Sequence, residues 1–327
     1  MPTTNEELRQ KIILLPTANG SIRSERTVLN YCSNMRILYK RMNESEWNYE
    51  VHYFRDNADK VCQYLSNHYK MPTAQNYLSS IIISLQAHEI IVPENYTELM
   101  NKNGEILRNN SNKQLKTQEE DKNWTTIKVL QKQLTSIKKS LDLRNVFHKE
   151  FKDLTYFERN QLRNWLVGNL YVGDSENPPL RSDYVMSIIP ASLYKNVNKE
   201  ENYLVVHGRN KKFFHLGKYK TSNHYGEKVI PVGKKLNTVL NLYLKVHKEP
   251  DYLIYTNRLK PVTQESLAKI VPEVFKGLNK HITINLLRHI YISEFLPPGG
   301  PNLEQKKEIA DKMCHSITKQ EEYKKMD

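Results

Sequence analysis

Hydrophobic residues recur at helical spacing over much of the first hundred positions of the chain. The first such stretch begins at Ser24, a residue type that caps helices, and two more stretches follow it. Their apolar positions are Val28, Tyr31, Met35, Leu38, Tyr39 and Met42, then Val61 and Leu65, then Tyr77, Ile81, Ile82 and Leu85. Residues 1–20 are polar and predict a short N-terminal arm. The pattern therefore predicts a small all-α domain over residues 21–107.

The segment 108–123 has almost no apolar side chain and predicts a flexible linker. Helical spacing returns after it, at residues 125–143, 155–172 and 234–247. We therefore expect a second domain over residues 124–327.

Between these helices, three short stretches have the composition of strands. Residues 203–207, 213–221 and 227–232 are separated by turn-forming residues and predict a small antiparallel sheet. Lys218 and Lys220 are two residues apart, so the pleat of a strand would place them on one face. The fold class that these patterns predict is mainly α with a small antiparallel β-sheet, that is, α+β.

Candidate chemistry is concentrated between Thr283 and the C-terminal end. Thr283 caps a predicted helix that carries Asn285 and Arg288, which are three residues apart and share one face. An ordinary helix with one paired arginine shows the same pattern. His289 lies a full turn beyond Asn285, and we expect it to be a buried structural residue.

A second predicted helix follows a breaker over residues 297–301. It begins at Asn302, with Gln305 three residues later as in a capping box, and it ends at the sequence Cys314-His315-Ser316. Tyr323 then lies in a segment that is too polar for a core. We therefore expect its side chain to be exposed.

A further arginine stands out in the middle of the chain. Arg181 follows the sequence Pro-Pro-Leu and precedes Asp183. We expect Arg181 to open a helix, where outward N–H groups and a guanidinium together suit an anion. A surface pair between Arg181 and Asp183 is the alternative.

The charge composition predicts a negatively charged partner. The chain has 49 Lys and Arg against 36 Asp and Glu, a net charge of +13, and this fits a partner with a dense row of phosphates. An anionic membrane would attract the same charge, but the sequence shows no amphipathic basic helix, signal peptide or long apolar run. We expect an intracellular protein that is not secreted.

The cysteines and the standard motifs indicate no metal site. Cys32, Cys62 and Cys314 lie far apart without a C-x-x-C pair, and neither a Walker loop nor a His-Glu-x-x-His sequence is present. We therefore expect no metal and no other cofactor.

The order Arg288, then His315 in an Ala-x-x-Met-x-His-Ser segment, then Tyr323 resembles the C-terminal signature of the tyrosine recombinases, the phage-integrase family. In that signature the first catalytic position is a His, where this chain has Asn285, and the residue before the second His is Gly, where this chain has Cys314. The segment that begins at Ser24 is similar to the family's core-binding domain. The resemblance covers about residues 20–327. The abundance of Asn, Lys, Ile and Tyr suggests an AT-rich genome, as in many viruses and mobile elements.

The resemblance implies an integrase, a site-specific recombinase that cuts and rejoins double-stranded DNA through a 3′-phosphotyrosine without metal or ATP. It also implies a clamp on DNA formed by the core-binding and catalytic domains. The catalytic residues it implies are Arg181, Lys220, Asn285, Arg288, His315 and Tyr323. The arginines and His315 would contact the phosphate, Tyr323 would attack it, and Lys220 would protonate the leaving oxygen.

Alternatives remain open at this stage. A basic hairpin that only lies on phosphates would explain Lys218 and Lys220 equally well. A type IB topoisomerase uses nearly the same residues, and Asn285 would also fit a catalytically impaired DNA-binding relative. Because only residues 324–327 follow Tyr323, we expect a monomer that forms tetramers only on paired DNA sites.

Overall fold

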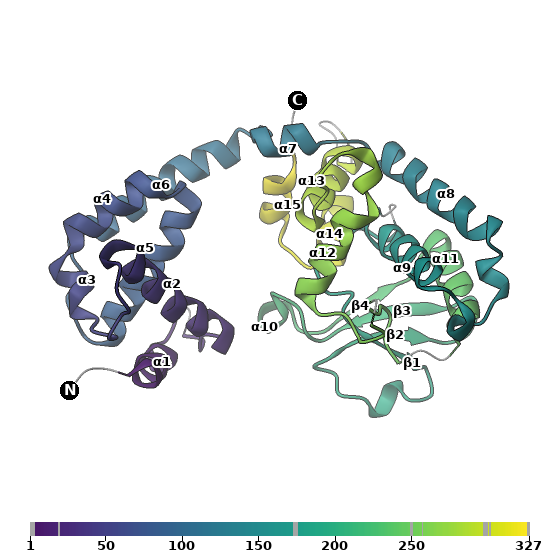
Figure 1. Cartoon of the computed structure of the whole chain (residues 1–327), viewed down its shortest axis with the longest axis horizontal. Coiled ribbons are helices and arrows are strands. Elements are labelled where there is room, and N and C mark those ends of the chain that lie inside the picture. Colours follow the sequence, from purple (N-terminus) through teal and green to yellow (C-terminus); the bar gives the residue numbers. More distant parts are fainter. Residues whose placement is uncertain are drawn as a thin grey trace. The chain divides into compact units, whose positions relative to one another are not determined.

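The computed structural model describes residues 4–18, 20–172, 176–248, 251–256, 258–296, 300 and 302–325. The chain divides into two compact units, Met1–Lys113 and Gln114–Asp327. It is mainly helical with a small sheet of strands, which confirms the predicted α+β class (Figure 1). In the described part of the chain, no helix combines the length and the apolar character needed to cross a membrane.

All the regular secondary structure among the described residues of the first unit is helical. Its helices are α1 (Asn5–Leu14), α2 (Glu25–Asn43), α3 (His52–Asp56), α4 (Ala58–His68), α5 (Met71–Ala87) and α6 (Glu94–Asn112). The side chain of Ser24 accepts a hydrogen bond from Thr27 N and so begins α2, as the sequence predicts. Helix α5 packs against α1, α2 and α6, and the fully buried side chains of this core are mainly aliphatic.

The predicted polar arm is wrong for residues 5–14, because these form α1. The helix starts with a capping box between Thr4 and Glu7 and buries Leu8 and Ile12 completely in the core of the first unit. Two apolar side chains four residues apart anchor a short helix whose other positions are largely polar. The polar composition of the segment concealed it.

The boundary between the units falls within the predicted linker, but that segment is not extended throughout. Helix α6 continues to Asn112, and α7 (Gln118–Asn123) begins at a capping box between Thr117 and Glu120. The polar composition of this segment predicted flexibility. Its capping residues and helix-forming side chains nevertheless allow a short helix.

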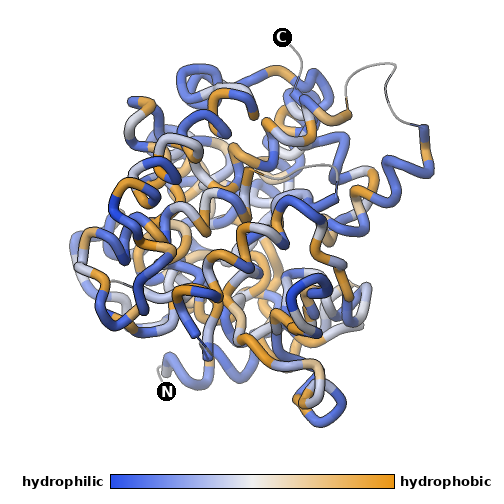
Figure 2. The backbone as a smooth tube through the Cα atoms, turned by 90° about the vertical axis from the view of Figure 1, so that its right-hand side faces the viewer, coloured by the Kyte–Doolittle hydropathy of each residue, from blue (hydrophilic) through white to orange (hydrophobic). Residues whose placement is uncertain are grey.

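The second unit combines helices with the sheet. Its helices are α7, α8 (Ile127–Leu143), α9 (Tyr156–Tyr171), α10 (Ser222–Tyr225), α11 (Lys234–Val246), α12 (Gln264–Val274), α13 (Ile284–Phe295), α14 (Leu303–Lys312) and α15 (Ile317–Tyr323), with short 3₁₀ turns between some of them. Helix α9 packs against α8, α11 and α12, and α15 packs against α13 and α14. Hydrophobic positions recur turn by turn along the helices (Figure 2).

The sheet has the order β1 (Ser187–Pro190), β2 (Asn202–Val206), β3 (Lys212–Leu216) and β4 (Lys228–Pro231). Strands β2, β3 and β4 pair antiparallel as predicted. The prediction of a purely antiparallel sheet is wrong, because β1 pairs parallel with β2 and makes the sheet mixed. This pairing joins segments far enough apart for a crossover, which local alternation cannot reveal.

The second predicted strand ends earlier than expected. Strand β3 stops at Leu216. The next residue is Gly217, whose backbone runs so close to the Lys199 carbonyl that an added Cβ would lie 1.9 Å from that oxygen. The following residues form a loop and then α10 in place of the predicted hairpin turn. Lys218 and Lys220 are both exposed on either side of the buried Tyr219, but they are not strand residues.

Candidate active site

Arg288 lies at the centre of the candidate site and is almost completely buried, with 1% of its surface exposed. Its Nη1 donates to the Pro179 carbonyl at 2.6 Å and its Nη2 to the Met313 carbonyl at 3.4 Å. Its Nε is buried without a hydrogen-bond partner among the described residues. Backbone carbonyls thus fix the guanidinium on α13 in one orientation.

Arg181 joins this cluster from a different part of the chain. It lies in a turn and does not open a helix, so the predicted helix start is wrong there. Side chains take the carbonyls of this turn: Tyr171 donates to the Arg181 carbonyl and Asn202 to the Asp183 carbonyl, so these groups are not available for a helix ladder. Arg181 Nη1 donates to the Cys314 carbonyl at 3.2 Å.

The turn between α14 and α15 therefore connects the two arginines. The Met313 carbonyl accepts from Arg288, and the next carbonyl along the chain accepts from Arg181. Cys314 has φ +56°, in the left-handed region that favours glycine. This conformation gives a physical reason for the Gly that the recombinase signature has at this position, where the present chain has Cys314.

Tyr323 is buried, with 7% of its surface exposed, so the prediction of an exposed tyrosine is wrong. Residues 319–323 of the polar segment form the end of α15, and Tyr323 is the residue of that helix that enters an apolar cluster with Tyr291, Ile292 and Leu296. Its ring lies 4.9 Å from the Arg288 guanidinium carbon.

The electrostatic surroundings favour the ionised form of Tyr323. Burial alone would raise the pKa of the phenol, but the charges and hydrogen bonds of Arg288 and Arg181 outweigh burial and lower it. A free tyrosine has a pKa of about 10, so only about one in a thousand is ionised at pH 7. The two arginines thus increase the fraction of the nucleophilic phenolate.

His315 lies beside the same tyrosine, with the two ring centroids 5.6 Å apart. Burial and the charges of Arg288 and Arg181 lower the pKa of His315 to about 3, so the ring is neutral near pH 7. Its Nδ1 lies 3.0 Å from the Ser316 carbonyl, which can only accept, so Nδ1 carries the hydrogen. The buried Nε2 is then an acceptor, and it has no partner within the described residues.

Lys220 lies next to this cluster but is held differently. Its neighbour Thr221 donates to the Cys314 carbonyl at 3.1 Å, the same carbonyl that accepts from Arg181. The Lys220 side chain is exposed and makes no ion pair or hydrogen bond within the described part of the chain. Lys218, by contrast, forms an ion pair with Glu201 at 3.2 Å.

Asn285 is not brought to the arginines by any contact in the described structure. Its Nδ2 lies 3.1 Å from Nε2 of His289, and both residues line a small pocket with Glu119 and Glu120. His289 is buried, as expected. It nevertheless contacts Asn285, because residues four apart on a helix lie on the same face and their side chains can meet.

His289 is a site residue that the sequence argument did not identify as functional. Its Nδ1 lies 2.7 Å from the Tyr323 carbonyl, and its ring centroid lies 4.8 Å from that of Tyr323. The only sequence signal was its position directly after Arg288. Of the six predicted residues, the structure joins Arg181, Arg288, His315 and Tyr323, places Lys220 beside them, and links Asn285 to them through His289.

Asp183 is buried close to both arginines, but the described structure shows no ion pair between Asp183 and Arg181. Burial raises the pKa of this carboxyl, and the charges of Arg181 and Arg288 only partly oppose the effect. The predicted alternative of a surface pair between the two residues is therefore not what the structure shows.

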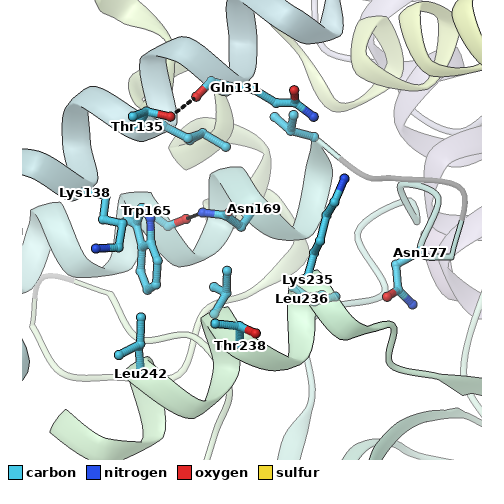
Figure 3. A pocket seen from close by; sticks show the side chains of 13 residues that line it. Gln131, Thr135, Lys138, Trp165, Asn169, Asn177, Lys235, Leu236, Thr238 and Leu242 are labelled. Atoms are coloured by element: carbon cyan, nitrogen blue, oxygen red, sulfur yellow. Dashed lines mark hydrogen bonds between the residues drawn. The ribbon is translucent and has the colours of Figure 1, made fainter.

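A pocket of about 420 Å³ lies elsewhere in the second unit, between α8, α9 and α11 (Figure 3). Trp165 and Leu242 supply apolar walls, and Gln131, Asn169 and Lys235 supply polar groups. None of the predicted site residues lines it. This pocket is therefore separate from the arginine cluster.

No protein family matches the chain, and no curated protein matches it. Among solved structures, it is similar to the crystal structure of XerA recombinase, with a TM-score of 0.39 and 13% sequence identity. That similarity covers 99% of this chain and 94% of the other. Identity at this level is too low to transfer the role of any residue.

Proposed function

We propose that this chain is a site-specific recombinase of the tyrosine type, which breaks and rejoins double-stranded DNA through a covalent 3′-phosphotyrosine. The observation that carries the proposal is the convergence of Tyr323 on two arginines that backbone carbonyls hold in place. A surface tyrosine would not need such neighbours. The net charge of +13 supports a polyanionic partner.

The arginines are suited to stabilise the reacting phosphate. Negative charge spreads over the non-bridging oxygens during phosphoryl transfer, and fixed donors aimed at that charge lower the barrier. The buried guanidinium of Arg288 supplies a fixed positive charge for the phosphate. Arg181 uses Nη1 for the Cys314 carbonyl, and the rest of its half-exposed guanidinium can face the phosphate.

In the proposed step, Tyr323 Oη attacks phosphorus, the bond from phosphorus to the 5′ oxygen breaks, and a 3′-phosphotyrosine and a 5′ hydroxyl are formed. His315 Nε2 accepts the phenolic proton. The charge of the phosphodiester opposes that of the arginines and so raises the pKa of His315 when DNA is bound. The exposed ammonium of Lys220 gives a proton to the leaving 5′ oxygen.

Rejoining is the same step in reverse, with a 5′ hydroxyl as the nucleophile. The phosphotyrosine bond retains the free energy of the broken phosphodiester, so the reaction needs no ATP. A 5′ hydroxyl from a second duplex gives recombination, and we propose that this occurs in a tetramer assembled on paired DNA sites. The original 5′ hydroxyl gives only relaxation, as in a type IB topoisomerase.

The test is covalent trapping on a nicked suicide duplex, from which the 5′ fragment diffuses away. We expect the wild-type chain to form an adduct and Tyr323→Phe to form none, because the substitution removes only the nucleophilic oxygen. DNA affinity measured by fluorescence anisotropy should stay within about threefold of wild type, since hydroxyl loss removes at most one weak hydrogen bond to DNA. An adduct with Tyr323→Phe would assign the chemistry to another residue.

A second assay separates recombination from relaxation. Joined products from two differently labelled duplexes support a recombinase, whereas relaxed circles without joined products indicate a topoisomerase. A wild-type chain that binds DNA but gives no adduct would be a catalytically impaired relative.

A further inference from the structure

The residues that follow the unit boundary also contact the segment that carries Tyr323. Gln114 Nε2 donates to the Glu321 carbonyl at 2.9 Å. Lys325 Nζ donates to the Leu115 carbonyl at 3.2 Å. Residues Gln114–Glu120, the boundary segment, therefore hold the chain two residues before the tyrosine and two residues after it.

Glu120 adds charge to these contacts. One oxygen of its carboxylate lies 3.5 Å from Lys325 Nζ, and the other lies 3.4 Å from His289 Nε2. Burial favours the neutral carboxyl, but the Thr117 backbone N–H and the charge of Lys325 lower the pKa of Glu120 overall. Glu120 is therefore ionised near pH 7.

His289 also contacts the main chain of the nucleophile. The Tyr323 carbonyl can only accept, so the hydrogen lies on His289 Nδ1 and the ring holds the tyrosine backbone at 2.7 Å. Burial lowers the pKa of His289, which keeps the ring neutral near pH 7. Its Nε2 then accepts from Asn285.

Apolar packing does little to fix α15. Within the described residues it buries only Gln320 and Tyr323, and neither polar atom of the Gln320 amide has a hydrogen-bond partner. The position of such a helix depends on its polar contacts. Lys306 of α14 provides one of these, and Ser293 of α13 accepts from Lys325 N just after the helix.

We propose that the boundary segment positions Tyr323 for attack on the phosphate, so that the chemical step depends on residues at the junction of the two units. The inference rests on the proposed function. Glu120 and Lys325 act through the backbone around the tyrosine, and no described contact joins either of them to Arg181. Their loss should slow the attack without weakening DNA binding.

The experiment uses Glu120→Gln and Lys325→Met in the full chain. A glutamine at position 120 still completes the capping box with Thr117, so α7 keeps its start. Asp121→Asn is the matched control, because it removes an exposed carboxylate from the same turn of α7. Lys325→Arg keeps the charge and the donors and should restore the wild-type rate.

Two readouts are measured for each variant: the adduct rate at saturating suicide duplex, and deuterium exchange of the amides in residues 317–325. We expect the adduct rate to fall about tenfold in Glu120→Gln and Lys325→Met, because small displacements of a reacting group have large effects on rate. Exchange should become faster in the same two variants, while their DNA affinity stays at the wild-type value. The control Asp121→Asn should match wild type in both readouts.

The outcomes separate the two proposals. If wild type forms no adduct that depends on Tyr323, the proposed function fails, and faster exchange in Glu120→Gln still shows that the boundary segment holds α15. If wild type forms the adduct and both variants match its rate, only the positioning role is overturned. An equal loss of rate in Asp121→Asn overturns it as well.

Discussion

Arg288 and Lys220 lie close to the same turn but are held in opposite ways. Arg288 is buried, and two backbone carbonyls fix its guanidinium. Lys220 is exposed, and its ammonium has no ion pair or hydrogen bond within the described residues. A group that stabilises developing charge acts best when it is already in place, whereas a proton donor needs to reach its acceptor. The contrast therefore matches the two proposed roles.

The freedom of Lys220 belongs to its side chain and not to the loop. The buried Asn202 accepts from Lys218 N and donates to the Lys218 carbonyl, both at 2.9 Å. Tyr219 donates to the Gly226 carbonyl at 2.7 Å and closes the loop. The loop backbone is therefore fixed by hydrogen bonds, while the Lys220 ammonium is exposed. The fixed backbone limits the positions that the ammonium can occupy.

Arg288→Met should break this contrast with the largest effect. Loss of the fixed charge should slow adduct formation about 10²–10³-fold, as removal of one donor does in comparable sites. The pKa of Tyr323 should rise, because burial is then opposed mainly by Arg181, so any residual activity should need higher pH. Single-turnover trapping as a function of pH measures both effects.

Arg288→Lys sharpens the same test. It keeps the positive charge, but an ammonium cannot make the forked contacts of a guanidinium, so we expect only a small recovery of rate. The exposed Arg258 provides the control, and Arg258→Met should react like wild type. A wild-type rate in Arg288→Met would show that the buried arginine is structural.

Lys220→Ala should have the next largest effect. On ordinary DNA we expect cleavage to slow about 10²-fold, the usual contribution of a positioned acid. On a duplex with a 5′-bridging phosphorothiolate the rate should recover, because sulfur leaves without a proton. Lys218→Ala is the control, since Lys218 already pairs with Glu201. Selective recovery of the Lys218 variant would instead show that Lys218 is the proton donor.

Asn285→Ala should have a smaller effect than either change, because Asn285 reaches the site only through His289. We expect the adduct rate to fall about threefold, comparable to losing a hydrogen bond of about 0.5–1 kcal/mol. Asn285→His should stay close to wild type, since an imidazole N–H can replace the amide donor to His289. Single-turnover rates decide this, and an Asn285→Ala variant as slow as Arg288→Met would make Asn285 a direct phosphate ligand.

The parts of the fold that were predictable from the sequence depend on local signals. Ser24 and the apolar spacing after it define α2, and Thr283 defines the start of α13. The spacing of Arg288, His315 and Tyr323 also indicated candidate residues in advance. In each case a cap or a short motif carries the information within a few residues.

The rest depends on contacts between distant segments. The parallel pairing of β1, the burial of Tyr323 under α13 and the contact of His289 with the Tyr323 carbonyl all require the tertiary structure. The breaker predicted at 297–301 lies mostly outside the described residues. A polar segment such as 319–325 looks exposed in sequence, because nothing local shows that one of its side chains enters a pocket formed by other helices.

The smallest predicted effect concerns Cys314, whose backbone orients the carbonyl shared by Arg181 and Thr221. A non-glycine residue in the left-handed region is strained by about 1 kcal/mol or more. Cys314→Ala keeps that strain and loses part of the buried thiol surface, whereas Cys314→Gly loses more surface but relieves the strain. We therefore expect Cys314→Gly to be at least as stable as Cys314→Ala in urea unfolding. Cys62 in α4 is the control, where glycine should be less stable than alanine by about 1 kcal/mol. The same order at both cysteines would show that the turn at Cys314 carries no strain of this kind.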